Sequence, residues 1–208
     1  MDVHLVHLRF SIITILSMLI QIADSHVPEK ECWNMTIYSK YSKSYVYVRN
    51  NTVRADSEDK TYLYSIGLEN SIKFFLYDPV SHKFICMSKE GRLIAKKVPR
   101  TDFCTFEDRV FAFGTSYIQY VQPHYKQAIK FSKRGRSLPR QFRHPNSHND
   151  MSAFLSKKEF LEMDECDHLK RGFCCRMRSK RRFYAKLPKE LRTLCRSILP
   201  SEKYCHRS

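Results

Sequence analysis

The chain has 208 residues, of which 42% are hydrophobic, and this length and composition predict one globular domain with a tail. Its 14 Phe and 12 Tyr favour strands. The formal net charge of +16 predicts attraction to a polyanion. Nucleic acid, anionic lipid and sulfated glycans all fit this charge, and the cellular compartment decides among them.

Residues 1–25 predict a secretory signal peptide. An apolar run at 12–22 follows Arg9, and Ala23 and Ser25 place small residues at the −3 and −1 positions before a cut after Ser25. The alternative is an uncleaved membrane anchor, but the run is shorter than the roughly 20 residues that a spanning helix needs. We therefore expect a secreted protein with no membrane insertion.

Three stretches predict β-hairpins: 45–53, 84–96 and 130–136. In the middle stretch, residues 88–91 form the predicted turn, where Gly91 can adopt positive φ. Asn51, 40 residues earlier, is the predicted turn residue of the first hairpin because Asn tolerates the left-handed conformation. The middle turn recurs 44 residues later as Ser132, Lys133, Gly135 and Arg136. A period of about 40 residues predicts a threefold β repeat.

The stretch 84–96 resembles the signature hairpin of the fibroblast growth factors, most closely the subgroup of factors eight, seventeen and eighteen. Residues 38–48 resemble the first two strands of that family. Cys104-Thr105-Phe106, followed by Tyr117 and Tyr120, is similar to its central C-x-F and Y-x-x-Y elements. The resemblance covers residues 38–155 and indicates a divergent, invertebrate-type member.

Together, the resemblance and the repeat predict an all-β fold, a β-trefoil of three pseudo-symmetric repeats and about twelve strands at residues 38–156. A short segment, 26–37, precedes it, and a basic, cysteine-rich extension, 157–208, follows it. Residues 157–165 are predicted to form a short helix. The predicted core residues are Phe84, Leu93, Phe106, Ile129 and Leu155.

Eight cysteines in a secreted chain are expected to pair. In the resembled subgroup the cysteines that match Cys86 and Cys104 are bridged, which implies the same disulfide here; the alternative is two buried free thiols, the pattern of other family members. Six cysteines remain, and their 15 pairings cannot be resolved from sequence: Cys32, Cys166, Cys174, Cys175, Cys195 and Cys205. If all six pair, one bridge must join Cys32 to the segment after the core.

Basic residues concentrate near the third hairpin, at Lys126, Lys130, Lys133, Arg134, Arg136, Arg140 and Arg143. The family binds heparan sulfate through the loop after this hairpin, and the resemblance places five residues there: Lys133, Arg134, Arg136, Arg140 and Arg143. Arg can donate bidentate hydrogen bonds to sulfate-like oxyanions, and Lys supplies a point charge. The alternative is a solvated basic face that keeps the protein soluble.

The resemblance implies three receptor contacts. Tyr38 falls at a position that touches an immunoglobulin domain, Tyr120 is the second Tyr of the Y-x-x-Y element, and Leu155 resembles a last-strand contact. Exposed aromatic side chains are frequent hot spots, although packing within the sheet or core is the alternative for both tyrosines. Phe113 replaces the usual Glu four residues before that element, so receptor affinity or selectivity is expected to differ.

Three motifs predict covalent processing. Asn34 and Asn50 begin N-glycosylation sequons. Residues 178–181, Arg-Ser-Lys-Arg, match the pattern cut by secretory proprotein convertases, here after Arg181; a basic surface strip is an equal alternative. A cut there does not release the tail if Cys195 or Cys205 is bridged to a residue upstream.

The leading interpretation is a secreted growth factor that activates a fibroblast growth factor receptor tyrosine kinase, with heparan sulfate as co-receptor. Its partners are then the receptor's immunoglobulin-like domains and heparan sulfate proteoglycan, not nucleic acid. The alternative is a secreted trefoil that binds glycans or inhibits proteases without receptor signalling.

An enzyme is disfavoured because the sequence shows no nucleophile–base pair in a motif, no phosphate loop and no recognisable carboxylate pair. Zinc at Cys174 and Cys175 with His168 and His206 is disfavoured because the spacing fits no zinc-finger pattern. No cofactor or metal is expected.

Overall fold

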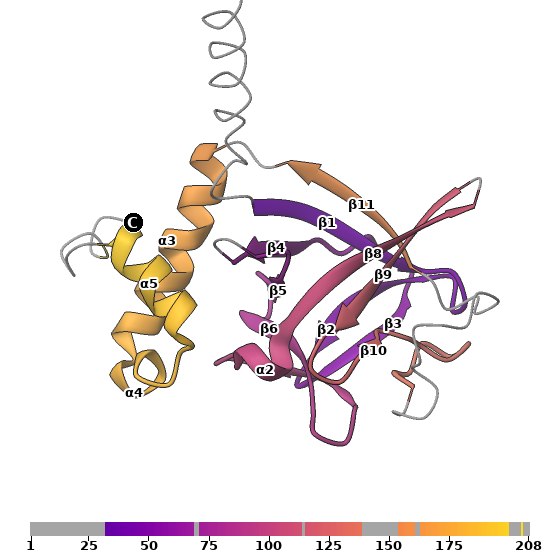
Figure 1. The fold of residues 1–208 in the computed structure, drawn as a ribbon, viewed down its shortest axis with the longest axis horizontal. Coiled ribbons are helices and arrows are strands. Elements are labelled where there is room, and N and C mark those ends of the chain that lie inside the picture. Colours follow the sequence, from indigo (N-terminus) through magenta and orange to yellow (C-terminus); the bar gives the residue numbers. More distant parts are fainter. Residues whose placement is uncertain are drawn as a thin grey trace, which may run out of the picture.

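The computed structural model describes residues 32–68, 71–113, 115–138, 154–160, 163–199 and 205. The predicted signal peptide, residues 1–25, lies outside them. Within the described part the strands are β1 (Cys32–Ser39), β2 (Ser44–Arg49), β3 (Thr52–Ser57), β4 (Leu63–Gly67), β5 (Phe74–Asp78), β6 (Lys83–Met87), β7 (Leu93–Lys96), β8 (Thr105–Phe113), β9 (Thr115–Gln122), β10 (Gln127–Ala128) and β11 (Phe154–Phe160). The helices are α2 (Thr101–Cys104), α3 (Met163–Ser179), α4 (Arg181–Tyr184) and α5 (Lys189–Ile198), as Figure 1 shows.

Six strands close into an antiparallel barrel in the order β1, β4, β5, β8, β9 and β11. The first strand joins both ends of this ring, since β1 pairs with β4 and also with β11. The hairpins β2–β3 and β6–β7 lie outside the ring and pair with each other at Thr52 and Ile94. A closed six-stranded barrel with added hairpins is a β-trefoil, so the predicted fold class is confirmed.

The core repeats three times along the chain, at spacings of 39 and 44 residues. The side chains of Ile37, Leu76 and Tyr120, one from each repeat, are all 0% exposed and belong to the same cluster. Three further sets of the cluster follow the same spacing: Met35, Phe74 and Ile118; Val46, Ile85 and Ile129; Val48, Met87 and Phe131. Of the predicted core residues, Phe84, Leu93, Phe106 and Ile129 are buried, whereas the side chain of Leu155 is outside the described part.

Two of the three predicted turns share one backbone geometry. In each, a Ser amide donates to an Arg carbonyl four residues on, from Ser88 to Arg92 and from Ser132 to Arg136, both at 2.8 Å. Gly91 and Gly135 have φ of 74° and 68°, a region that glycine enters without steric cost. The repeat read from the sequence is confirmed at these two turns.

The first hairpin differs from the prediction by one residue. Its positive φ, 57°, lies at Asn50 and not at Asn51. Arg49 pairs with Thr52, so only two residues form the loop. Two-residue hairpin loops of types I′ and II′ require positive φ at the first loop residue, which explains the shift.

A second set of three equivalent turns joins β1 to β2, β5 to β6 and β9 to β10. The sequence predicts the middle one, at residues 78–82, but does not reveal that it repeats. The last residue of each turn has positive φ, and these residues are Lys43, His82 and Lys126. A buried polar side chain just before each turn accepts a hydrogen bond from the amide three residues on, at 3.3, 3.2 and 2.7 Å for Ser39, Asp78 and Gln122. The three accepting residues differ in type, and this hides the repeat.

The structure corrects two predicted boundaries. Strand β1 begins at Cys32, so part of segment 26–37 belongs to the sheet, and β11 continues to Phe160 where a helix over 157–165 was predicted. Seven residues of each strand pair, from Trp33 with Phe160 to Ser39 with Phe154. Pairing with a long neighbouring strand overrides local helix preference in this segment.

The extension after residue 160 is helical and packs on the trefoil, so it is not a separate tail. Phe173 of α3 is 2% exposed, and its ring lies 5.9 and 5.2 Å from the rings of Tyr77 and Phe84. In Figure 1 the helices lie beside the barrel, on the side of β4, β5 and β6. The helical side of this interface includes residues four apart along α5 and its ends: Leu187, Leu191, Cys195 and Leu199.

Disulfides cross-link both the trefoil and the helical extension. Cys86 is joined to Cys104, the pairing that the resemblance implies, and closing this separation of 18 residues contributes about 3 kcal/mol in the chain-entropy treatment. Within the extension the bridges are Cys174–Cys195 and Cys175–Cys205. Cys32 is disulfide-bonded as well, and the one cysteine of the sequence not yet named, Cys166, has a side chain outside the described part.

We expect Gly135→Ala to destabilise the protein by at least about 2 kcal/mol. A Cβ there would lie 2.3 Å from the Ala55 carbonyl oxygen at φ +68°, which combines left-handed strain of about 1–2 kcal/mol with overpacking. Gly172→Ala is the matched control, because its Cβ meets nothing within 4 Å and a helical site gains roughly 0.5–1 kcal/mol from the change. Urea unfolding measures both, and equal effects would contradict the role of Gly135.

Candidate binding surfaces

The first surface is built on the turn at residues 132–136, called the basic turn here. The Ser132 hydroxyl oxygen accepts a hydrogen bond from the Arg136 amide at 3.1 Å, and the Gly135 amide donates to the Ser132 carbonyl at 2.9 Å. The Gly135 carbonyl in turn accepts from the Ala55 amide of β3 at 2.9 Å. The turn is therefore held to the trefoil by backbone contacts, which leaves its long side chains available for a ligand.

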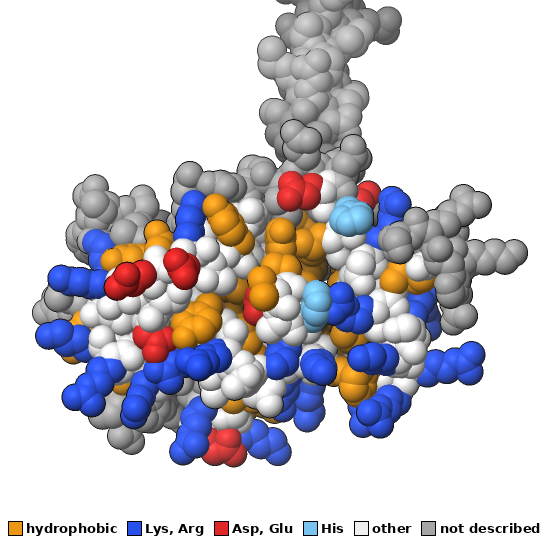
Figure 2. All heavy atoms as spheres, turned by 180° about the vertical axis from the view of Figure 1, so that it is seen from behind, with side chains coloured by type: hydrophobic (Ala, Val, Ile, Leu, Met, Phe, Trp, Pro, Cys, Tyr) orange, Lys and Arg blue, Asp and Glu red, His pale blue; other side chains and the backbone are white. Residues whose placement is uncertain are grey.

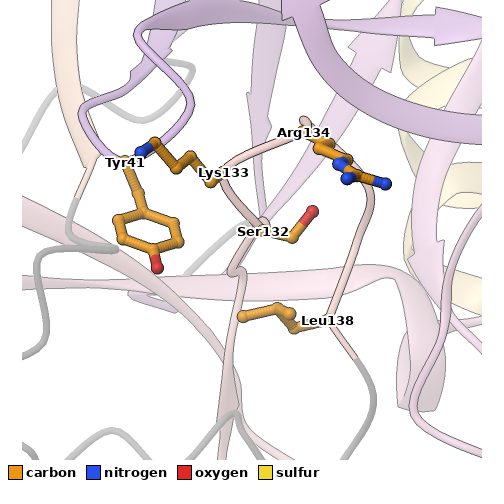
Figure 3. Close-up of a pocket in the computed structure, with 5 residues that line it drawn as sticks. All are labelled: Tyr41, Ser132, Lys133, Arg134 and Leu138. Atoms are coloured by element: carbon orange, nitrogen blue, oxygen red, sulfur yellow. The ribbon is translucent and has the colours of Figure 1, made fainter.

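An open hollow of about 470 Å³ lies beside the basic turn, lined by Tyr41, Ser132, Lys133, Arg134 and Leu138. Figure 3 shows Tyr41 and Lys133 on one side of this hollow and Arg134 on the other. Tyr41, which is 43% exposed, comes from the loop between β1 and β2. The sequence did not single out Tyr41, because nothing in its local sequence indicates that this loop lies beside the basic turn.

The predicted cations do not all share this surface. Lys133, Arg134 and Arg136 are exposed on the basic turn, whereas Arg140 and Arg143 lie outside the described residues. Lys130, which the sequence grouped with them, is 1% exposed and belongs to the interior. Residues 127–131 are all buried, Lys130 among them, so a count of charges along the chain overstates the charge of one surface.

The equivalent turn of the second repeat shows what distinguishes the basic turn. It reads Ser-Lys-Glu-Gly-Arg at residues 88–92, with Glu90 where the third repeat has Arg134. Hydrogen bonding to Ser88 lowers the pKa of Glu90, so this carboxylate stays charged and offsets its basic neighbours. One backbone shape thus carries three cations in the third repeat and a mixed charge in the second.

An ion pair lies beside the basic turn on β3. Arg54 donates to Asp56 through both Nε and Nη2, and this hydrogen bonding lowers the pKa of Asp56. Tyr47 donates to the same carboxylate at 2.9 Å. Arg54 faces Arg136 across an isolated β-bridge. Asp56 is thus committed to Arg54 and Tyr47, and no described carboxylate forms an ion pair with a basic-turn cation.

The second surface follows the seam between β1, β2 and β11. Tyr38 lies directly opposite Leu155 in the sheet and also opposite Tyr45. The rings of Tyr38 and Tyr45 meet edge to face, with centroids 5.2 Å apart. Two predicted receptor residues, Tyr38 and Leu155, are therefore neighbours although 117 positions separate them in the chain.

The structure corrects the role expected for Tyr120. Its side chain is 0% exposed, within the main hydrophobic cluster, and its ring meets that of Phe74 at 5.8 Å. Its equivalents in the other repeats, Ile37 and Leu76, are core residues too. A fully buried side chain offers no area to a partner, so Tyr120 stabilises the fold.

The predicted processing sites differ in accessibility. Asn34 lies within β1 between β4 and β11 and is half-buried, so it is the less accessible of the two sequons, and its glycosylation stays a prediction. Asn50 is exposed on a hairpin turn, and its glycosylation stays a prediction. Arg181 is exposed at the start of α4, and a cut after it would leave the pieces joined by Cys174–Cys195 and Cys175–Cys205.

Positive charge extends beyond the basic turn. Figure 2 shows Lys and Arg side chains across the lower half of the rear face, continuing onto the side of the helices, with few Asp or Glu among them. The described residues hold no group of three His, Cys, Asp or Glu side chains arranged for a metal ion. Cys174 and Cys175, which the zinc alternative required as thiolates, are both in disulfides.

These features define a β-trefoil protein with a cationic turn on its third repeat. A family model described as "Fibroblast growth factor" matches residues 34–155, more than half of the chain, and the chain belongs to this family of growth factors. The family is not one of enzymes. No curated protein matches the chain in a sequence search. Among the described residues, no helix is long and apolar enough to cross a membrane.

We expect Tyr120→Ala to lower the free energy of unfolding by about 3–5 kcal/mol, since it empties a fully buried aromatic site. Tyr38→Ala should cost clearly less, because that side chain is only half-buried. Urea unfolding of both variants tests the two placements. A Tyr120 variant with wild-type stability would show that this side chain lies at the surface after all.

Proposed function

We propose that the protein is a secreted ligand that binds the immunoglobulin-like domains of a fibroblast growth factor receptor tyrosine kinase and activates it, with heparan sulfate as co-receptor. The cellular outcomes are proliferation, differentiation or migration. The observation that carries the proposal is the basic turn: three exposed cations, none paired to a described carboxylate, on a hydrogen-bonded turn of a trefoil from this family.

The chemistry of the basic turn suits a sulfated chain. Arg134 and Arg136 present planar guanidinium groups that can each hold two oxyanion oxygens, while Lys133 adds a compact charge. The open hollow beside Tyr41 admits part of a polymer without enclosing it. Arg140 and Arg143 remain proposed contributors. By holding ligand and receptor on one chain, the glycan raises their effective concentration and promotes receptor dimerisation.

The proposed receptor surface is the seam around Tyr38 and Leu155. We add Tyr45 to this proposal because its ring contacts that of Tyr38. Aromatic side chains bury a large area at low entropic cost, which suits them to a binding hot spot. Phe113, in place of the usual acidic residue, is proposed to alter receptor affinity or selectivity.

Secretion and family placement complete the proposal. The three bridges resolved among the described cysteines favour an oxidising compartment, in keeping with a signal peptide at residues 1–25 and a glycan at Asn50. The bridge Cys86–Cys104 supports a position near the subgroup of factors eight, seventeen and eighteen, whose matching cysteines are paired. The invertebrate-type assignment stays a prediction from the resemblance.

Charge reversal on the basic turn should weaken heparin binding selectively. We expect Lys133→Glu with Arg136→Glu to elute from immobilised heparin at lower salt than the wild type. With fewer contacts to sulfate groups, binding releases fewer counterions and is weaker. The control is Lys89→Glu with Arg92→Glu, which makes the same charge change on the matching turn of the second repeat, where both side chains are exposed. Equal elution of the two double variants would reject the basic turn as a glycan site.

Signalling separates the proposal from its alternative. In cells that express a single fibroblast growth factor receptor type, we expect the protein with heparin to raise receptor phosphorylation. We expect Tyr38→Ala to reduce this response at unchanged heparin retention, in a variant that is still fully folded at the assay temperature. No response at saturating protein, with heparin retention intact, would favour a trefoil that binds glycans or inhibits proteases without signalling.

A further inference from the structure

The helical extension carries a second, separate hollow. It is open, measures about 240 Å³, and is lined by Arg178, Arg181, Tyr184, Ala185 and Arg196. Three of its five lining residues are arginines, and the other two contribute an aromatic ring and a methyl group. We call it the arginine hollow, and none of its residues belongs to the basic turn.

Covalent and backbone contacts hold the arginine hollow in shape. The disulfide Cys174–Cys195 ties α3 to α5. Arg178 donates from Nη2 to the Cys195 carbonyl at 3.2 Å, and its guanidinium lies 5.7 Å from the Tyr184 ring. This hydrogen bond uses one of the five N–H donors of the guanidinium. Arg178 is thus fixed in orientation while most of its donors stay available to a ligand.

The other two arginines are exposed and make no ion pair with a described carboxylate. Arg181 begins α4, and Arg196 lies in the last turn of α5. The described acidic residues of the extension are few, and one of them, Glu190, accepts a hydrogen bond from Thr101 of the trefoil at 3.2 Å. The arginine hollow therefore concentrates positive charge that the described part of the protein does not neutralise.

We propose that the arginine hollow is a second binding site for a sulfated glycan. Its guanidinium groups match sulfate half-esters and sugar carboxylates, which accept paired hydrogen bonds from Arg. Tyr184 and Ala185 provide an apolar patch on which the carbon-bound hydrogens of a sugar ring can pack, a contact that a bare anion does not use. The small volume and open shape suit a short segment of a polymer.

This site does not depend on the basic turn. In Figure 1 the helices lie at one end of the molecule, and the segment after β10, which contains the basic turn, lies toward the other end. Two sites so placed let one protein hold two glycan chains, or two parts of one long chain. Simultaneous occupancy raises avidity because the second contact forms at high effective concentration.

The test uses the full secreted protein in which Lys133→Glu and Arg136→Glu have already weakened the basic turn. To this background we add Arg181→Glu with Arg196→Glu, or the control Arg171→Glu with Lys189→Glu. The control makes the same charge change at exposed positions of the extension outside the arginine hollow. Binding to size-defined heparin oligosaccharides is measured against salt, with melting temperature and disulfide mapping as checks on folding.

The slope of log affinity against log salt is negative. We expect it to become shallower by about two for the hollow variant, one for each cation lost, and by clearly less for the control. Equal slopes for the two variants would overturn the proposal. If the charge-reversed variant does not fold, Arg181→Gln with Arg196→Gln makes the same comparison against Arg171→Gln with Lys189→Gln.

Two other polyanions check the class of ligand. Single-stranded DNA and phosphatidylserine vesicles are tested with the same variants, and the hollow variant should lose more affinity for heparin than for either. A larger loss on DNA or vesicles, with heparin binding kept, would overturn the proposal. The basic turn is judged by its own pair of variants, so a failure there and a failure at the arginine hollow give different results.

Discussion

The closure of the barrel by β1 is the constraint on which the rest of the structure depends. This strand pairs along seven residues with β11, the last strand, and along four with β4. Because the two ends of the trefoil meet there, Tyr38 comes to lie opposite Leu155. The same closure brings the three repeats around one core, in which equivalent side chains such as Ile37, Leu76 and Tyr120 pack together.

The pseudo-symmetry separates shape from charge. The turns at 88–92 and 132–136 share their backbone hydrogen bonds and their glycine conformation. Folding therefore places the same conformational requirement on both turns. The two turns differ in their exposed side chains, with Glu90 in one turn and Arg134 in the other. A fold that repeats one turn geometry can in this way carry a different charge on each copy of the turn.

The helical extension adds a second core to the first. Phe173 packs on Tyr77 and Phe84, and the bridge Cys174–Cys195 lies in the same hydrophobic cluster as Cys86–Cys104. Burial behind these aromatic rings raises the pKa of Tyr77 to about 12. The extension thus shields one side of the trefoil from solvent and carries its own positive charge, while the basic turn lies elsewhere.

The sequence by itself indicated the fold class, through the family resemblance together with the repeat, and it also determined the two glycine turns and four buried core residues, Phe84, Leu93, Phe106 and Ile129. The turns follow from local conformation, because glycine enters the positive φ region without steric cost. The sequence also contains Leu187, Leu191 and Cys195 at a spacing of four residues, a helical period, within a segment dominated by charge and cysteine. Only the tertiary structure decided that Tyr120 is buried, that β11 replaces the predicted start of a helix, and that Lys130 is buried while Arg134 is exposed. Such outcomes depend on which strand lies beside which, and distant segments of the chain settle that question together.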